Sequence, residues 1–138
     1  MRPHLIEGAR VHSIVGAFYT VYNYFGYGLA EAVYAGGLEC ELGDRGHHVV
    51  REYAVDVRYK GRHAAWQRLD MVVDDKIVVE IKATEKAPPF AARQLLSYLR
   101  ATSFEVGVLL HFGPEAKFDR YVDSPKTVRL DLPESDSR

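Results

Sequence analysis

The chain has 138 residues, of which 47% are hydrophobic and 27% charged, and these are ordinary values for one globular domain with a single core. No apolar run approaches the roughly 20 residues of a membrane span, and the formal net charge of −1 gives no overall attraction to nucleic acid, so a nucleic-acid partner would require a local basic patch. The single cysteine, Cys40, excludes an internal disulfide and, with no signal-peptide core at the N-terminus, predicts a cytoplasmic protein.

The periodicity of the apolar residues predicts an alternating series of helices and strands. In chain order, we expect helices over 6–25 and 29–42, strands over 49–60, 64–73 and 77–83, a helix over 90–102 and a strand over 104–112. The last strand is nearly continuously apolar, which is typical of a central strand covered on both faces. A short hairpin is expected at 117–122 and 127–130. One domain is then predicted over residues 1–132, with a disordered tail over 133–138.

The segment 49–60 alternates between apolar and charged residues, as in a half-buried strand. The residues expected on its core side are Tyr53, Val55, Val57 and Tyr59.

The next two strands are predicted to form a hairpin, because apolar runs at 71–73 and 77–79 flank the polar loop 74–76. With a three-residue loop, Asp70 faces Glu80, and the alternation of a strand places Lys82 beside Glu80. A two-residue loop would turn Glu80 to the other side of the sheet.

These charged residues lie where the hairpin should be most buried, and a buried carboxylate without a partner is costly. A lysine neutralises the charge of one carboxylate, whereas a divalent metal ion neutralises both and would give the two carboxylates a catalytic role. The alternative is a structural ion pair of Lys82 with Glu80 or Asp70 on a solvated sheet face. Taken alone, the hairpin favours the structural ion pair, because so short a motif is weak evidence for a metal site.

Five blocks of sequence, in order, carry a resemblance to a known family. They are Gly28-Leu-Ala-Glu31-Ala-Val-Tyr34, Tyr59-Lys60-Gly61, Leu69-Asp70 with Glu80-Ile81-Lys82-Ala83, 94–102 and 106–113. In this order the chain resembles the PD-(D/E)xK nuclease superfamily and, within it, the GxxExxY proteins, over about residues 14–122. It departs from the pattern at Leu69, where the superfamily has proline, and at His111, where the family has asparagine. The resemblance implies an α/β, restriction-endonuclease-like fold with an αβββαβ core, in which helices flank a central mixed β-sheet.

The resemblance also implies a metal-dependent nuclease that hydrolyses phosphodiester bonds of DNA with Mg²⁺ or Mn²⁺. The catalytic residues would be Glu31, Asp70, Glu80, Lys82 and Gln94. The metal ligands would be Asp70, Glu80, Glu31 and the main-chain carbonyl of Ile81, while Lys82 would orient or deprotonate the attacking water. Two alternatives stay open, because Glu31 also suits the first turn of a helix and Gln94 could simply face solvent.

Basic residues could form the patch that holds phosphate groups. The candidates for nucleic-acid binding are Lys60, Arg62, Arg68, Arg93, Arg100 and, by resemblance, Tyr98. Charge on an exposed strand otherwise serves solubility. The alternative function is a catalytically silent module of the same fold that binds nucleic acid or a protein, and cleavage of RNA is also open. A homodimer is a further hypothesis, with Tyr19, Tyr22 and Tyr24 as possible interface residues.

Overall fold

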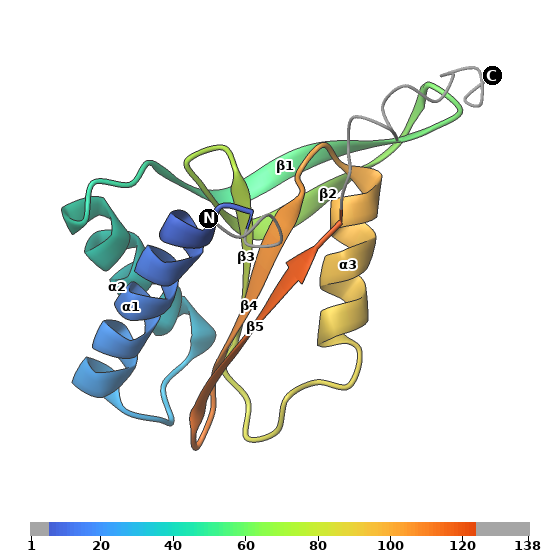
Figure 1. Ribbon diagram of the computed structural model, residues 1–138. Coiled ribbons are helices and arrows are strands. Elements are labelled where there is room, and N and C mark those ends of the chain that lie inside the picture. The colour runs from blue at the N-terminus through green and yellow to red at the C-terminus, as the bar shows by residue number, and fades with distance from the viewer. Residues whose placement is uncertain (1–5, 124–138) are drawn as a thin grey trace.

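A five-stranded mixed sheet separates two helical layers in the computed structural model, which describes residues 6–123 (Figure 1). The elements are α1 (Gly8–Phe25), α2 (Glu31–Asp44), β1 (Val49–Tyr59), β2 (Arg62–Val73), β3 (Ile77–Lys82), α3 (Ala91–Ala101), β4 (Val106–Phe112) and β5 (Ala116–Val122). The strand order is β1-β2-β3-β4-β5, and only the β3–β4 pair is parallel, since α3 forms the crossover between these two strands. The predicted mixed sheet with flanking helices is confirmed.

The last predicted hairpin lies only partly within the described residues. Its first strand, expected at 117–122, is present as β5, which pairs antiparallel with β4. The expected second arm at 127–130 and the tail at 133–138 lie outside the described residues. Between residues 6 and 123, no helix is long and apolar enough to cross a membrane.

Each face of the sheet carries its own apolar cluster. The larger cluster joins α1 and α2 to alternate residues of the central strands, and Phe18 and Tyr34 both pack against Phe112 there. The smaller cluster joins Leu95 and Leu99 of α3 to the opposite face. All seven residues of β4 are buried, as its apolar sequence predicts.

Two glycines allow the helices to approach closely. A Cβ atom on Gly107 of β4 would lie 2.8 Å from Leu95 Cδ1 of α3. A Cβ atom on Gly37 of α2 would lie 3.0 Å from the Phe25 ring of α1. A larger residue at either position would force the side chain of Leu95 or of Phe25 to move.

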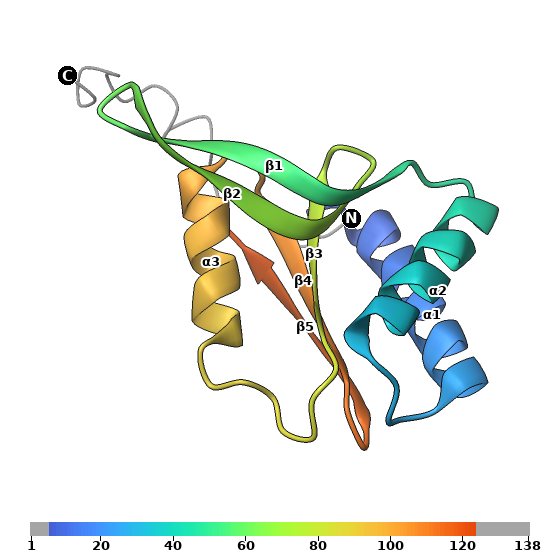
Figure 2. The ribbon, with the colours of Figure 1, turned by 180° about the vertical axis from the view of Figure 1, so that it is seen from behind.

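The distal part of the β1–β2 pair extends beyond the body of the domain (Figure 2). Tyr53 and Val55 pack with the α3 cluster, as expected, but a bulge follows Val57 and the strands then leave the core. Tyr59 is 62% exposed, so its predicted place on the core side was wrong. We refer to residues 54–68, two strands and their turn, as the β-arm.

A polar network ties α1 to the turns at one end of the sheet. Asp74, in the β2–β3 turn, accepts hydrogen bonds from Arg10 Nε at 3.0 Å and from the backbone N–H of His48 at 2.8 Å. His47 Nδ1 lies 2.7 Å from the same carboxylate, while its Nε2 lies 2.7 Å from Ser13 Oγ. One carboxylate therefore connects three segments that are distant in sequence.

Replacing Asp74 with asparagine should lower the free energy of unfolding by about 1–3 kcal/mol, because the charged acceptor of this network is lost. Burial raises the pKa of Asp74, but hydrogen bonds from His47, His48 and Arg10 outweigh it and the net pKa is lowered from 3.8. The stabilisation is therefore present above about pH 5 and declines as the pH falls below the unfolded-state pKa. Urea unfolding over this range measures it. Asp75→Asn in the same turn is the matched control and should change little, since Asp75 is exposed.

Candidate active site

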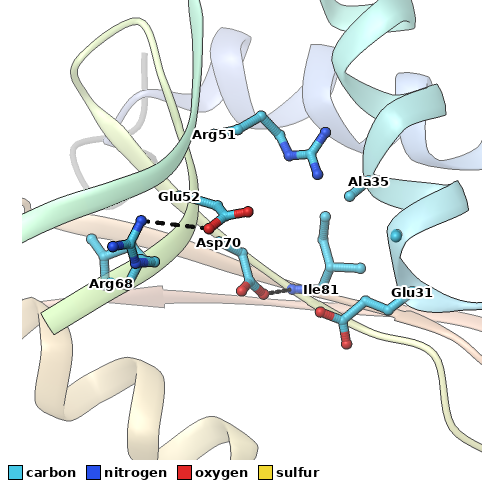
Figure 3. A pocket seen from close by; sticks show the side chains of 9 residues that line it. Glu31, Ala35, Arg51, Glu52, Arg68, Asp70 and Ile81 are labelled. Atoms are coloured by element: carbon cyan, nitrogen blue, oxygen red, sulfur yellow. Dashed lines mark hydrogen bonds and ion pairs between the residues drawn. The ribbon is translucent and has the colours of Figure 1, made fainter.

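The hairpin places Asp70 where β2 and β3 separate. Its three-residue turn pairs Val73 with Ile77 and Met71 with Val79, which confirms the predicted register. The backbone pairing ends there, and the Asp70 side chain continues the contact by accepting a hydrogen bond from the Ile81 N–H at 2.9 Å (Figure 3). The N–H of Asp70 in turn donates to Glu80 Oε1 at 3.5 Å. The two acidic residues therefore lie side by side, through side-chain contacts rather than backbone pairing.

Glu80 is a buried carboxylate, only 4% exposed. Its neighbours Val79 and Ile81 belong to the cluster under α1 and α2, so strand alternation directs Glu80 and Lys82 to the α3 face. Burial and then repulsion from Asp70 raise the pKa of Glu80 to about 7, although Lys82, with Nζ at 3.9 Å from Oε2, lowers it. Near neutral pH this carboxyl group is therefore present in both its protonated and its ionised form.

Glu31 approaches the same carboxylates from α2. It is the first residue of that helix and extends toward Asp70 (Figure 3). Burial raises its pKa, repulsion from Asp70 raises it further, and Lys82 lowers it. Glu31 therefore belongs to the same charge cluster, whether or not it also suits the helix dipole.

Tyr34 holds the loop that precedes Glu31. The Tyr34 hydroxyl donates to Gly26 O at 2.5 Å and accepts from the Leu29 N–H at 3.2 Å, and its ring stacks on Phe112 at 4.3 Å. These contacts connect the start of α2 to the sheet, which sets where Glu31 lies.

A pocket of about 240 Å³ opens between α2 and strands β1, β2 and β3 (Figure 3). Its lining residues are Glu31, Ala32, Ala35, Arg51, Glu52, Arg68, Leu69, Asp70 and Ile81. Arg51 and Glu52 were not among the predicted site residues. The pairs on either side of Glu52 place it opposite Asp70, and this proximity depends on the β1–β2 register, which the sequence motifs do not specify.

On the α3 side, Tyr98 approaches the carboxylates. Burial and the charges of Glu80 and Asp70 raise its pKa, whereas hydrogen bonds with Gln94 and Gln67 lower it. Gln67 Nε2 donates to the Tyr98 hydroxyl at 3.1 Å. Gln94 and Gln67 thus both hydrogen-bond with Tyr98, near Glu80. Gln67 was not among the predicted site residues.

The predicted basic residues do not form one patch. Arg68 alone among them lines the carboxylate pocket, where it contacts Glu52 at 3.5 Å. Lys60 and Arg62 are at the tip of the β-arm, and Arg93 and Arg100 are exposed on α3.

The three tyrosines proposed for an interface have different environments. Tyr22 is partly buried and donates to the carbonyls of Gly113 and Pro114. Tyr19 packs edge-on against Phe118, and Tyr24 is 82% exposed.

The donor set of this cluster fits a hard divalent cation. Glu31, Asp70 and Glu80 carry three potential negative charges against the single Lys82, and burial, followed by repulsion from Asp70, raises the pKa values of Glu31 and Glu80. Within residues 6–123, no three Asp, Glu, His or Cys side chains come together as a ready-made ligand group. Mg²⁺ commonly uses only one or two carboxylates and completes its shell with water and substrate oxygens, so Asp70 and Glu80 suffice for it.

Comparison with known proteins agrees with this geometry. The model of the PD-(D/E)XK nuclease superfamily matches residues 9–121. The crystal structure of SSO0001 superposes with a TM-score of 0.52 at 23% identity, over 77% of this chain and 57% of that one, so the chain spans little more than half of that protein and the likeness concerns the fold. No curated protein matches the sequence. The family match over residues 9–121 shows that the chain belongs to the PD-(D/E)XK nuclease superfamily.

Proposed function

We propose that the protein is a nuclease of the GxxExxY group that hydrolyses phosphodiester bonds of DNA with Mg²⁺ or Mn²⁺. The observation that carries this proposal is the contact of Asp70 with Glu80 and Ile81, with Lys82 beside Glu80 and Glu31 facing them from α2. A purely structural ion pair would need one carboxylate, whereas Asp70 and Glu80 lie in contact beside one lysine and the charge of Glu31 acts on the same group.

Each residue of the cluster has a role that its place allows. Asp70, Glu80 and the carbonyl of Ile81 would hold the ion, and Glu31 would contact it directly or through water. When bound, the ion supplies a Lewis acid that activates water and balances charge on the phosphate group. Lys82 orients or deprotonates the attacking water.

The surrounding polar residues would bind substrate. Gln94, with Tyr98 hydrogen-bonded to it, orients the water or the scissile phosphate from α3. The residues that contact the nucleic-acid backbone are Arg68 at the pocket, Lys60 and Arg62 on the β-arm, and Arg93 and Arg100 on α3. The homodimer and the cytoplasmic location remain predictions from the sequence.

Cleavage assays with purified protein test the proposal. The substrates are plasmid DNA, single-stranded DNA, branched DNA and RNA. Each is incubated with the protein in Mg²⁺ or Mn²⁺, and in EDTA as the metal-free reference. We expect cleavage of DNA that requires the metal and falls to the EDTA background in Asp70→Asn. Asp75→Asn, an exposed aspartate in the turn of the same hairpin, should cleave as the unmodified protein does.

Calorimetric titration with Mn²⁺ separates the proposal from its alternative. A metal-binding signal that disappears in Asp70→Asn supports the nuclease. If Mn²⁺ produces no such signal and no substrate is cut, the protein is instead a silent module of this fold that binds nucleic acid or a protein.

A further inference from the structure

The only tryptophan of the chain, Trp66, lies on the surface of the β-arm. It is 68% exposed, although a tryptophan can bury more apolar area than any other residue and is usually well covered. It pairs across the arm with Asp56, and the His63 ring lies beside it at a centroid distance of 5.2 Å. One side of the indole is thus supported by the arm, while most of the ring is open to solvent.

Trp66 lies on the same face of β2 as Arg68, which lines the pocket at Asp70. Residues two apart on a strand point the same way, so Trp66 and Arg68 share one face of β2, whereas Gln67 contacts α3 on the other face. Arg68 and Asp70 line the carboxylate pocket. At about 3.3 Å per residue, Trp66 lies about 13 Å along β2 from Asp70, which is a few nucleotides of a nucleic-acid strand.

The charge of the β-arm complements phosphate. It contains four basic residues, Arg58, Lys60, Arg62 and Arg68, and one acidic residue, Asp56, in a chain whose net charge is −1. Arg58 partly serves the arm itself, because it donates to Gly61 O and Asp56. Arg68 contacts Glu52 at 3.5 Å, and both side chains are about two-thirds exposed, so this ion pair is weak and a phosphate can replace it.

We propose that Trp66 is a stacking platform for an unpaired base of a single-stranded nucleic acid whose backbone passes Arg68 on its way to the pocket at Asp70. This inference rests on the proposed function and adds a substrate class to it, namely nucleic acid with unpaired nucleotides next to the cleavage point. An exposed indole beside basic side chains matches single strands, because their base faces are accessible, whereas a duplex keeps its bases stacked on each other.

Fluorescence provides a site-specific test, because all tryptophan emission comes from Trp66. The Asp70→Asn protein in EDTA is titrated with a single-stranded oligonucleotide that forms no secondary structure and, separately, with the blunt-ended duplex of that strand and its complement. We expect saturable quenching by the single strand at concentrations where the duplex has little effect. Raising the salt concentration should weaken this binding, since phosphate contacts release counterions.

Variants then measure how much the indole contributes. In fluorescence anisotropy with a labelled single strand, Trp66→Ala should bind about tenfold more weakly or worse, and Trp66→Phe should retain part of the affinity. Tyr24→Ala is the matched control, because Tyr24 is an even more exposed aromatic residue on α1, and its affinity should stay unchanged.

Three outcomes would overturn the inference: no quenching by single strands, equal affinity of Trp66→Ala, or equally strong quenching by the duplex. Light scattering tests a fourth outcome. If the unmodified protein is a dimer and the Trp66→Ala variant is a monomer, the β-arm is an interface between copies of the chain. The proposed function fails separately. If the protein cleaves nucleic acid and Trp66→Ala binds and cleaves equally well, the proposed nuclease function holds and the role of Trp66 is wrong. If binding depends on Trp66 but nothing is cleaved in Mg²⁺ or Mn²⁺, Trp66 binds single strands on a catalytically silent module.

Discussion

In metal-free protein at about pH 8, Glu80→Gln should raise the free energy of unfolding by about 3 kcal/mol. The reason is the pKa of Glu80, which burial and the charge of Asp70 raise from 4.5 to about 7, so that ionising this carboxyl group destabilises the folded state. Between these two pKa values the folded protein binds more protons than the unfolded chain. The stability of the unmodified protein therefore falls as the pH rises through this window, and glutamine, which stays neutral, removes the loss.

Urea unfolding in EDTA at about pH 5 and about pH 8 measures the difference between the two proteins. The gain should be large at the higher pH and small at the lower one. Glu115→Gln is a suitable control, because Glu115 is exposed in the turn after β4 and its removal should not change the pH profile. A parallel pH profile for Glu80→Gln and the unmodified protein would show that Glu80 is ionised at little cost.

Mn²⁺ should reverse the comparison, because a cation stabilises the ionised form of Glu80. We expect Mn²⁺ to raise the melting temperature of the unmodified protein at about pH 8 and to leave that of Glu80→Gln nearly unchanged. Equal shifts in the two proteins would mean that the ion binds elsewhere. If only the unmodified protein shifts, the buried carboxylate destabilises the metal-free protein, and a bound ion offsets this cost.

The sequence predicted most elements of the fold because their periodicity is strong. In α3, Ala91, Leu95 and Leu99 recur every four residues and are all buried. The β2–β3 register followed from the three-residue loop, and it is confirmed by the pairing of Met71 with Val79. These features depend on residues that are near one another in the chain, so local patterns determine them.

Features that depend on distant pairing were harder to predict. Tyr59 continues the alternation of β1, yet the bulge after Val57 carries it out of the core. The alternation of apolar and polar residues along a strand does not show whether a helix packs on its apolar side. The pairing of β5 with β4 was not predicted, because the sequence of β4 alone does not indicate which strand lies next to it.

The candidate site shows the same division. The motifs brought Asp70, Glu80, Lys82 and Glu31 together, and the structure places these four in one charge cluster. Arg51, Glu52 and Gln67 approach the cluster only because β1, β2 and α3 pack as they do. No short motif encodes such contacts, because each of these residues is ordinary at its own position.

Lys82→Met should reduce DNA cleavage by about 10²–10⁴-fold while Mn²⁺ binding persists, if Lys82 orients or deprotonates the attacking water. Methionine keeps the apolar stem of this partly buried side chain and removes only its ammonium group. Loss of that charge also leaves Asp70 and Glu80 with less compensation, so the affinity for Mn²⁺ should stay equal or increase. Asp70→Asn, in contrast, should lose both cleavage and metal binding.

A second readout distinguishes a reacting lysine from a structural one. Lys82 lowers the pKa values of Glu80 and Glu31, so in Lys82→Met both should rise and the metal-free protein should become less stable at about pH 8. Lys76→Met is the control, since Lys76 is exposed in the β2–β3 turn and should affect neither measurement. Loss of stability without loss of cleavage would identify Lys82 as the ion-pair partner of Glu80 alone. Loss of cleavage in Mn²⁺-saturated protein, where the carboxylates are already compensated, would place the ammonium group in the reaction itself.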